Sequence, residues 1–379
     1  MDRRRFCLGL TLAGLGRAAQ AQTQAQAAGQ PRSVTDLAGR TVRLAGAPRR
    51  IVLLEARDLL TMSLLLPDPA ARVVGWAAVD RIDSPALQAS LARGRRIPEV
   101  GKQTPNTISL EGIVALAPDL VVASAYMAPA SGDGGFLQRL ESLGIPVAFS
   151  DVASNSGGAD ATAPSGPIAT MHRHLRLWGD ILDARERADA YTAYAGQRLS
   201  LVAQRLAGAP AATTYLEVQS TLDDCCWAAG TQVWGELLAL AGGKPLPGVT
   251  APWYQKLQRE YLLATPFEAY IASGGGWAAG GRPAIGPGID PARGREGLER
   301  LVSRPGFAAL PGALRQHTHG IWTGLITMAP LNPLFVEIAA KWLHPDRCAD
   351  LDPARTLEDI NRRFLAQPVA GPLWVSLKE

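Results

Sequence analysis

Two adjacent cysteines, Cys225 and Cys226, are followed directly by Trp227. Consecutive Cα atoms lie about 3.8 Å apart, below the usual disulfide range of about 4.4 to 6.8 Å, so a bond between these cysteines would be strained. A structural zinc site is disfavoured because no second cysteine pair exists, and redox catalysis because no Cys-x-x-Cys motif is present. Two interpretations stay open: a rigid oxidised turn, or the same turn as part of a ligand-contacting loop. We favour the second because a predicted strand precedes the pair.

Four of the five histidines form two close pairs, His172 with His174 and His317 with His319. Histidines at such spacing can bind zinc or manganese when further ligands join them. Neither pair follows directly after a predicted strand, where ligand-binding loops are expected. We therefore interpret these histidines as ordinary core or surface residues and expect no metal site.

Signatures of common enzyme classes are missing from the sequence. It contains no Gly-x-Ser-x-Gly, His-Glu-x-x-His, Walker A or Gly-x-Gly-x-x-Gly motif. The glycine-rich stretch at 273–288 lacks the spacing of a phosphate-binding loop. We assign no catalytic residue and expect a binding protein rather than an enzyme.

Residues 1–21 have the order of a secretory signal peptide. Arginines at positions 3 to 5 precede Phe6, and a short apolar run leads to the small-residue pattern Ala19-Gln20-Ala21. The Arg-Arg-x-Phe start is typical of twin-arginine export. The apolar run is far shorter than the roughly 20 residues that span a bilayer, which disfavours a membrane anchor. We expect cleavage after Ala21 and a periplasmic mature protein.

Cleavage would remove most of the positive charge. The chain has a formal charge of +4, and the signal segment contains four arginines and one aspartate, which leaves about +1. Such a chain offers no basic surface for nucleic acid. Residues 22–32 are polar and of low complexity, so we expect a flexible segment there.

The remaining sequence alternates between predicted strands and helices in two halves. Apolar strand patterns at 51–54, 71–77, 118–124 and 145–151 are separated by helical ones, which indicates parallel βαβ units. The second half repeats this outline, because Glu111 to Ser124 aligns with Glu260 to Ser273 without a gap. We expect an α/β fold of two similar lobes, with mainly parallel sheets flanked by helices.

The longest helical pattern lies between the two halves. Apolar and small residues recur at steps of three and four from Ala188 to Leu206, and Gly208 follows. A helix from Asp183 to Ala207 would be about 37 Å long. The predicted organisation is an N-terminal lobe at 33–180, a linker helix at 181–208 and a C-terminal lobe at 209–379.

Four stretches of the chain carry a family resemblance. They are VTDLAGRTVRLAGAPRRIV (34–52), VGKQTPNTISLEGIVALAPDLVVAS (100–124), WGELLALAGG (234–243) and LNPLFVEIAAKWLHPD (331–346). With them the chain resembles the periplasmic substrate-binding proteins of ABC importers for iron-siderophores, haem and cobalamin. The resemblance implies two α/β lobes joined by one long helix, a shallow ligand cleft between them and little hinge closure.

Ligands of open α/β sheets bind where loops leave the carboxyl ends of the strands. Aromatic faces and arginine forks in these loops suit a bulky, partly anionic chelate. The predicted ligand-binding residues are Arg57, Tyr126, Cys225, Cys226, Trp227, Trp253, Tyr254, Trp277, Arg282 and Trp322. Alternatives stay open: the aromatic residues could serve packing, and Arg57 could pair with Glu55 or Asp58.

Glu111 and Glu236 each lie early in a predicted helix, one in each lobe. The helix dipole favours a carboxylate at such a position, which is sufficient as a structural role. The resemblance implies that one exposed glutamate per lobe docks on arginines of the membrane permease. We assign this role to Glu111 and Glu236.

The residues and the resemblance together predict the periplasmic solute-binding component of an ABC importer. It would bind a ferric siderophore and deliver it to the permease in the inner membrane. The chelator would hold the iron, so we expect no cofactor, and we expect a monomer. The alternatives are a haem or cobalamin binding protein, then direct binding of Mn or Zn, or a sensor domain of the same fold.

Overall fold

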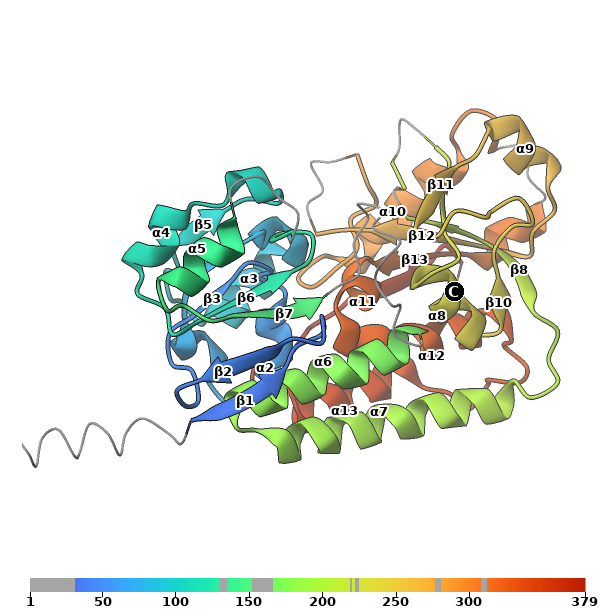
Figure 1. The fold of residues 1–379 in the computed structure, drawn as a ribbon. Helices are drawn as coiled ribbons and strands as arrows, with labels where there is room; N and C mark the ends of the chain where they lie inside the picture. Colours follow the sequence, from blue (N-terminus) through green and yellow to red (C-terminus); the bar gives the residue numbers. More distant parts are fainter. Residues whose placement is uncertain are drawn as a thin grey trace, which may run out of the picture.

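The computed structural model describes residues 31–129, 135–151, 166–218, 220–221, 225–276, 281–307 and 312–378. The predicted signal peptide, most of the polar segment after it, and Trp277 lie outside these ranges. The described chain forms two α/β lobes, with two long helices running side by side beneath both (Figure 1).

The N-terminal lobe contains a parallel five-stranded sheet in the order β5-β4-β3-β6-β7. Its strands are β3 (Ile51–Leu53), β4 (Val73–Ala77), β5 (Glu99–Gly101), β6 (Leu120–Ser124) and β7 (Val147–Asp151). Helices cover this sheet, which explains why the strands read as continuous apolar blocks in the sequence. An antiparallel hairpin of β1 (Arg32–Thr35) and β2 (Thr41–Leu44) precedes it.

Short helices connect these strands. They are α2 (Asp58–Leu65), α3 (Pro85–Ala92), α4 (Leu110–Ala115) and α5 (Phe136–Ser142), with 3-10 turns η1 (Pro69–Arg72), η2 (Val79–Ile82) and η3 (Pro105–Thr107). Serine caps fix two of the starts: Ser84 accepts the backbone N–H of Leu87, and Ser109 accepts that of Gly112. The loops after the strands therefore lead into helices at defined positions.

The C-terminal lobe contains a mixed sheet in the order β11-β9-β8-β12-β13-β14, with β10 (Gly243–Lys244) beside β8. The central strands β8 (Ala212–Glu217), β12 (Ala269–Gly274) and β13 (Thr318–Trp322) are parallel. The outer strands β9 (Trp227–Ala229), β11 (Tyr254–Lys256) and β14 (Trp374–Ser376) run antiparallel to their inner neighbours. The prediction of mainly parallel strands thus holds for the centre of this sheet but not for its edges.

Helices and turns complete this lobe. They are α8 (Trp234–Leu240), α9 (Arg259–Ala264), α10 (Pro291–Val302), α11 (Gly324–Thr327), α12 (Asn332–Leu343) and α13 (Pro353–Arg363), with η6 (Gly312–His317) and η7 (Ala329–Leu331). The apolar core includes the side chains of both sheets and of the long helices beneath them.

The two long helices are α6 (Gly166–Leu182) and α7 (Arg185–Arg205). Asp183 separates them with a left-handed backbone, φ +59°, so the continuous helix predicted from Asp183 to Ala207 begins later. Arg187 of α7 donates hydrogen bonds to the carbonyls of Leu64 at 3.1 Å and Phe364 at 2.9 Å. The helix therefore packs against elements of both lobes.

A buried polar cluster joins α2, β7 and α6. The hydroxyl of Ser150 donates to Asp58 Oδ2 at 2.5 Å, and His174 Nε2 lies 3.8 Å from Asp58 Oδ1. His174 Nδ1 donates to the Ser150 carbonyl at 2.9 Å, and Nε2 shares a hydrogen bond with the Thr61 hydroxyl. Burial raises the pKa of Asp58 to about 6, although His174 and Ser150 act in the opposite direction. Each polar group of the cluster is thus held in place by a partner on another element.

The raised pKa of Asp58 predicts a pH-dependent effect of Asp58→Asn, which keeps an oxygen acceptor for Ser150. Because the folded pKa lies above the ordinary 3.8, the stability from this group is full below about pH 4 and is lost as pH rises through about 6. The variant's free energy of unfolding, relative to the unsubstituted protein, should therefore increase by up to about 3 kcal/mol between pH 4 and pH 7.

Chemical denaturation at several pH values measures this difference. Asp68→Asn serves as a control, because Asp68 lies near the surface with Arg95. An Asp58→Asn difference that stays constant over the pH range would contradict the prediction.

Candidate functional site

Loops from the carboxyl ends of the parallel strands meet where the two lobes touch. We call this contact the seam, and its described segments are 54–57, 78–84, 274–276, 281–288 and 322–327. The carbonyl of Asp83 accepts the backbone N–H of Gly276 at 2.8 Å and the indole N–H of Trp322 at 3.2 Å. The hydroxyl of Ser84 donates to the carbonyl of Pro287 at 2.9 Å. The two lobes are therefore hydrogen-bonded directly to each other.

This close approach requires glycine on the C-terminal side of the seam. A Cβ atom on Gly275 would lie 2.5 Å from the Asp83 carboxylate, and one on Gly276 would lie 2.5 Å from the Asp83 carbonyl oxygen. Asp83 itself has a φ of +53°, in the left-handed region. The glycine-rich stretch thus allows contact between the lobes.

Arg57, predicted as a ligand residue, lies just before α2 and reaches across the seam. Its Nη1 donates to the carbonyl of Thr327 at 3.2 Å. Its Nε lies 3.3 Å from Glu55 Oε2, and its Nη2 lies 3.3 Å from Asp151 Oδ2. Burial opposes the charge, but the neighbouring carboxylates outweigh it and raise the pKa of Arg57. The open alternative that Arg57 pairs with Glu55 is therefore observed.

Arg81 was missed in the sequence analysis. Its Nη1 donates to Glu55 Oε1 at 2.5 Å, and its guanidinium lies 4.9 Å from the ring centre of Tyr126. The Ser124 hydroxyl donates to the same oxygen of Glu55 at 2.7 Å. Glu55 is only 1% exposed, so two arginines and a serine surround a buried carboxylate. Arg81 could have been predicted as a site residue because it follows the predicted strand at 71–77.

Arg282 is also paired across the seam. Its Nη2 donates to the Thr323 hydroxyl at 2.5 Å and to the carbonyl of Gly274 at 3.2 Å. Its Nη1 lies 3.8 Å from Asp83 Oδ2. Burial raises the pKa of Asp83 to about 6, and Arg282 acts in the opposite direction. Arg282 therefore links the two lobes through Asp83, another residue that the sequence analysis missed.

Trp322, predicted to lie in a loop after a strand, is instead the last residue of β13 and is fully buried. Its indole nitrogen is bound to the Asp83 carbonyl, and its ring packs so closely on Gly324 that a Cβ there would lie 2.3 Å away. In this structure the ring supports the seam from inside and offers no exposed face to a ligand.

Cys225 and Cys226 are joined by a disulfide, directly before β9. Cys226 is buried, whereas Cys225 and Trp227 are half-buried. The Trp227 ring meets the ring of Tyr254 edge-on, with the ring centres 5.5 Å apart, and Lys256 Nζ lies 5.4 Å from the Trp227 ring centre. We call Trp227 and Tyr254 the aromatic ribbon. Tyr254 is 39% exposed, so the ribbon presents an aromatic surface to solvent.

The predicted ligand residues thus divide into two groups. Arg57, Tyr126, Arg282 and Trp322 lie at or beside the seam, and Cys225, Cys226, Trp227, Trp253 and Tyr254 lie on or next to β9 and β11. The strand order places β11 three strands from β12, which corresponds to about 14 Å at 4.8 Å per strand.

The glutamates assigned to docking differ in their surroundings. Glu111 is exposed in the first turn of α4. Glu236 is half-buried, and its Oε2 accepts the backbone N–H of Val233 at 2.9 Å, which caps the start of α8. Glu260 is exposed in the first turn of α9. Glu236 thus serves its own helix, while the other two carboxylates face solvent.

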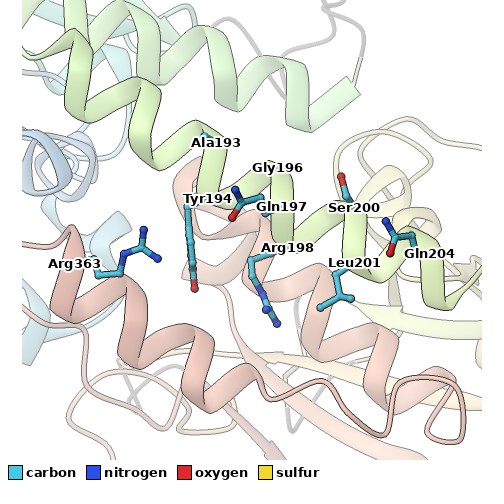
Figure 2. A pocket seen from close by; sticks show the side chains of 9 residues that line it. All are labelled: Ala193, Tyr194, Gly196, Gln197, Arg198, Ser200, Leu201, Gln204 and Arg363. Carbon is cyan, nitrogen blue, oxygen red and sulfur yellow. The ribbon is translucent and has the colours of Figure 1, made fainter.

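A surface hollow of about 700 Å³ lies elsewhere, between α7 and α13 (Figure 2). Arg198 in its wall forms two hydrogen bonds with Glu337, at 2.6 and 3.0 Å. The guanidinium of Arg363 lies 4.8 Å from the ring centre of Tyr194 and 4.9 Å from that of Phe364. The charged groups of this hollow therefore hold helices together.

The described ranges contain neither a metal-binding cluster nor a membrane-spanning helix. There, no group of three or more His, Cys, Asp and Glu residues is arranged to hold a metal ion. Among the helices of this part of the chain, none has the length and apolar character needed to cross a bilayer.

Solved structures share this fold. A TroA-like periplasmic binding protein, FepB from Veillonella parvula, has a TM-score of 0.76 at 20% identity, covering 92% of this chain and 100% of that chain. An ABC-type Fe3+-hydroxamate transport system protein from Saccharomonospora viridis has a TM-score of 0.58 at 21% identity, covering 83% and 99%. A periplasmic heme binding protein from Pseudomonas aeruginosa has a TM-score of 0.55 at 20% identity, covering 86% and 97%. The predicted two-lobed α/β fold is confirmed.

No curated protein sequence matches the chain. Residues 67–318 match the family model described as periplasmic binding protein, about two thirds of the 379 residues. This is a family of binding proteins, in agreement with the prediction that the chain is not an enzyme. Because the match covers more than half of the chain, the protein belongs to the periplasmic binding protein family.

Proposed function

We propose that the protein is the solute-binding component of an ABC importer, and that it binds a ferric siderophore at the seam. The main support is that loops from both sheets bring polar side chains together at the seam. There, Asp83 of one lobe contacts Arg282 and Trp322 of the other. A ligand bound there would contact both lobes, and delivery to a membrane permease would complete transport. The signal-like sequence at 1–21 supports export to the periplasm.

The side chains around the seam suit the outer surface of a chelate. Tyr126 and the aromatic ribbon offer faces for stacking, and backbone and side-chain groups of the seam offer hydrogen bonds to chelate oxygens and amides. The chelator would hold the iron, so the protein would supply no metal ligand.

We further propose that Glu111 and Glu260, rather than Glu236, dock on the permease. Glu111 is the second residue of α4, which leads into β6, and Glu260 is the second residue of α9, which leads into β12. The two positions therefore correspond in the repeated lobes, and Figure 1 shows α4 and α9 toward the outer ends of the two lobes. Exposed carboxylates so placed would set the register of a two-lobed protein on its partner.

Ligand binding can be measured by tryptophan-fluorescence titration of residues 22–379 against ferric siderophores, haem, cobalamin and Zn(II). We expect micromolar or tighter binding of a ferric siderophore. Tyr126→Ala and Trp227→Ala should each weaken it about tenfold, because each removes a stacking face worth about 1 kcal/mol or more. Tyr261→Ala is the control, since Tyr261 is an exposed tyrosine on α9. A response to Zn(II) alone would contradict the proposal.

Docking can be tested by uptake of a labelled ferric chelate in cells that carry the permease. Glu111→Gln and Glu260→Gln should each lower uptake several-fold with ligand affinity unchanged, because rim charges act on association. Glu236→Gln should leave uptake unchanged. If Glu236→Gln lowered uptake and Glu260→Gln did not, the docking role would belong to Glu236 and not to Glu260.

A further inference from the structure

The arginines described at the seam are matched by carboxylates. Arg57 contacts Glu55 and Asp151, Arg81 contacts Glu55, and Arg282 contacts Asp83. The three cations thus face three anions, and their formal charges cancel.

The charged residues next to these ion pairs add no net positive charge to the seam. Asp80, on the same turn as Arg81, adds an exposed carboxylate whose Oδ2 accepts from the Gln103 amide at 3.3 Å. Lys102 is paired with Glu99 on the adjoining loop. Lys256 lies apart from the seam, on the aromatic ribbon. The described seam therefore offers no surplus of positive charge to a strongly anionic ligand.

An anionic ligand would also have to take an arginine from its present partner. Glu55 is 1% exposed, and the side chain of Asp83 is 14% exposed. A buried carboxylate that loses its counter-ion is left without water to replace it, which is costly. Binding of a trianion would therefore work against the pairs that hold the seam.

Three buried side-chain atoms of the seam carry no hydrogen bond within the described part of the chain: Glu55 Oε2, Asp83 Oδ2 and Arg282 Nε. The two carboxylate oxygens accept hydrogen bonds and repel anions, although Glu55 Oε2 also lies 3.3 Å from Arg57 Nε, whereas Arg282 Nε is a donor. A chelate with amide groups on its surface would donate to the oxygens and accept from Arg282, whereas a shell of anionic oxygens would satisfy Arg282 alone.

We propose that the seam selects iron chelates of low net charge, and that Glu55 and Asp83 set this selectivity by neutralising Arg57, Arg81 and Arg282. The proposal rests on the function proposed above and narrows its ligand class. A ferric ion with three singly charged hydroxamates is neutral, whereas the same ion with three doubly charged catecholates carries three negative charges. The tris-hydroxamate class is the one that the seam fits.

The roles of the arginines follow from this assignment. Their guanidinium groups hold loops of the two lobes together, as in the bond from Arg57 to the carbonyl of Thr327. Tyr126, the aromatic ribbon and the two carboxylate oxygens then provide the contacts to the ligand. This narrows the sequence-based expectation of a partly anionic chelate.

The test compares two ferric chelates of different charge on the same protein. Residues 22–379 are titrated by fluorescence with ferrichrome, a neutral tris-hydroxamate, and with ferric enterobactin, a trianionic tris-catecholate. The quantity compared is the ratio of the dissociation constant of ferric enterobactin to that of ferrichrome. We expect ferrichrome to bind at least tenfold tighter, and its affinity to change little between low and high salt. Equal or tighter binding of ferric enterobactin would overturn the proposal.

Variants that remove the carboxylate charges make the test specific. Asp83→Asn removes the carboxylate charge that faces Arg282, and Glu55→Gln removes the one that faces Arg57 and Arg81. Each variant should bind ferric enterobactin more tightly and so reduce the ratio tenfold or more. Asp151→Asn, with a side chain that is 30% exposed, should act in the same direction and is the variant least able to disturb folding.

Asp68→Asn is the matched control, because Asp68 pairs with Arg95 outside the seam, and it should leave the ratio unchanged. A ratio that the seam variants do not alter would overturn the role of the carboxylates. If the protein bound neither ferric chelate but bound haem or Zn(II), the proposed function itself would fail, which is a different outcome from a reversed charge preference.

Discussion

Charged side chains that are buried at the seam need oppositely charged or hydrogen-bonding partners. This requirement determines how the two lobes contact each other. Glu55 is almost fully buried between Arg57 and Arg81, and Asp83 lies against Arg282 of the opposite lobe. Since an unpaired buried charge is strongly unfavourable, each of these side chains restricts the position of the loop that carries its partner. The seam is therefore fixed by paired charges as well as by packing.

Parallel strands explain why these charges converge. Strands that run in the same direction end at one edge of a sheet, so the loops after β3, β4, β12 and β13 all leave toward the other lobe. Beneath them, α7 packs against both lobes through Arg187 and through the pair of Arg198 with the buried Glu337. Both lobes therefore share α7 as a common support.

Much of the fold could be predicted because its signals are local. Continuous apolar blocks in the sequence predicted β3, β4, β6 and β7. The similarity of Glu111–Ser124 to Glu260–Ser273 indicated the second lobe. The outer strands β9 and β14 were missed because strands of three residues have no readable periodicity. The break at Asp183 was missed because neither glycine nor proline marks this left-handed residue.

The site was less predictable because its interactions are long-range. Arg57 and Arg282 were selected because each follows a predicted strand, and both lie at the seam, but their partners Asp151 and Asp83 lie far away in the sequence. A single sequence also gives no measure of burial, so Trp322 looked like an exposed aromatic face, although its ring is fully buried. Periodicity and loop position indicate which loops meet at the seam, whereas charge pairing is visible only in three dimensions.

The most direct test of the central claim is a crystal structure of the protein with a ferric chelate bound. We predict that Arg57, Arg81 and Arg282 keep their carboxylate partners, while the chelate lies against Tyr126 and donates hydrogen bonds to Glu55 Oε2 and Asp83 Oδ2. A complex in which anionic oxygens of the ligand sit between these arginines, with the carboxylates turned away, would contradict it.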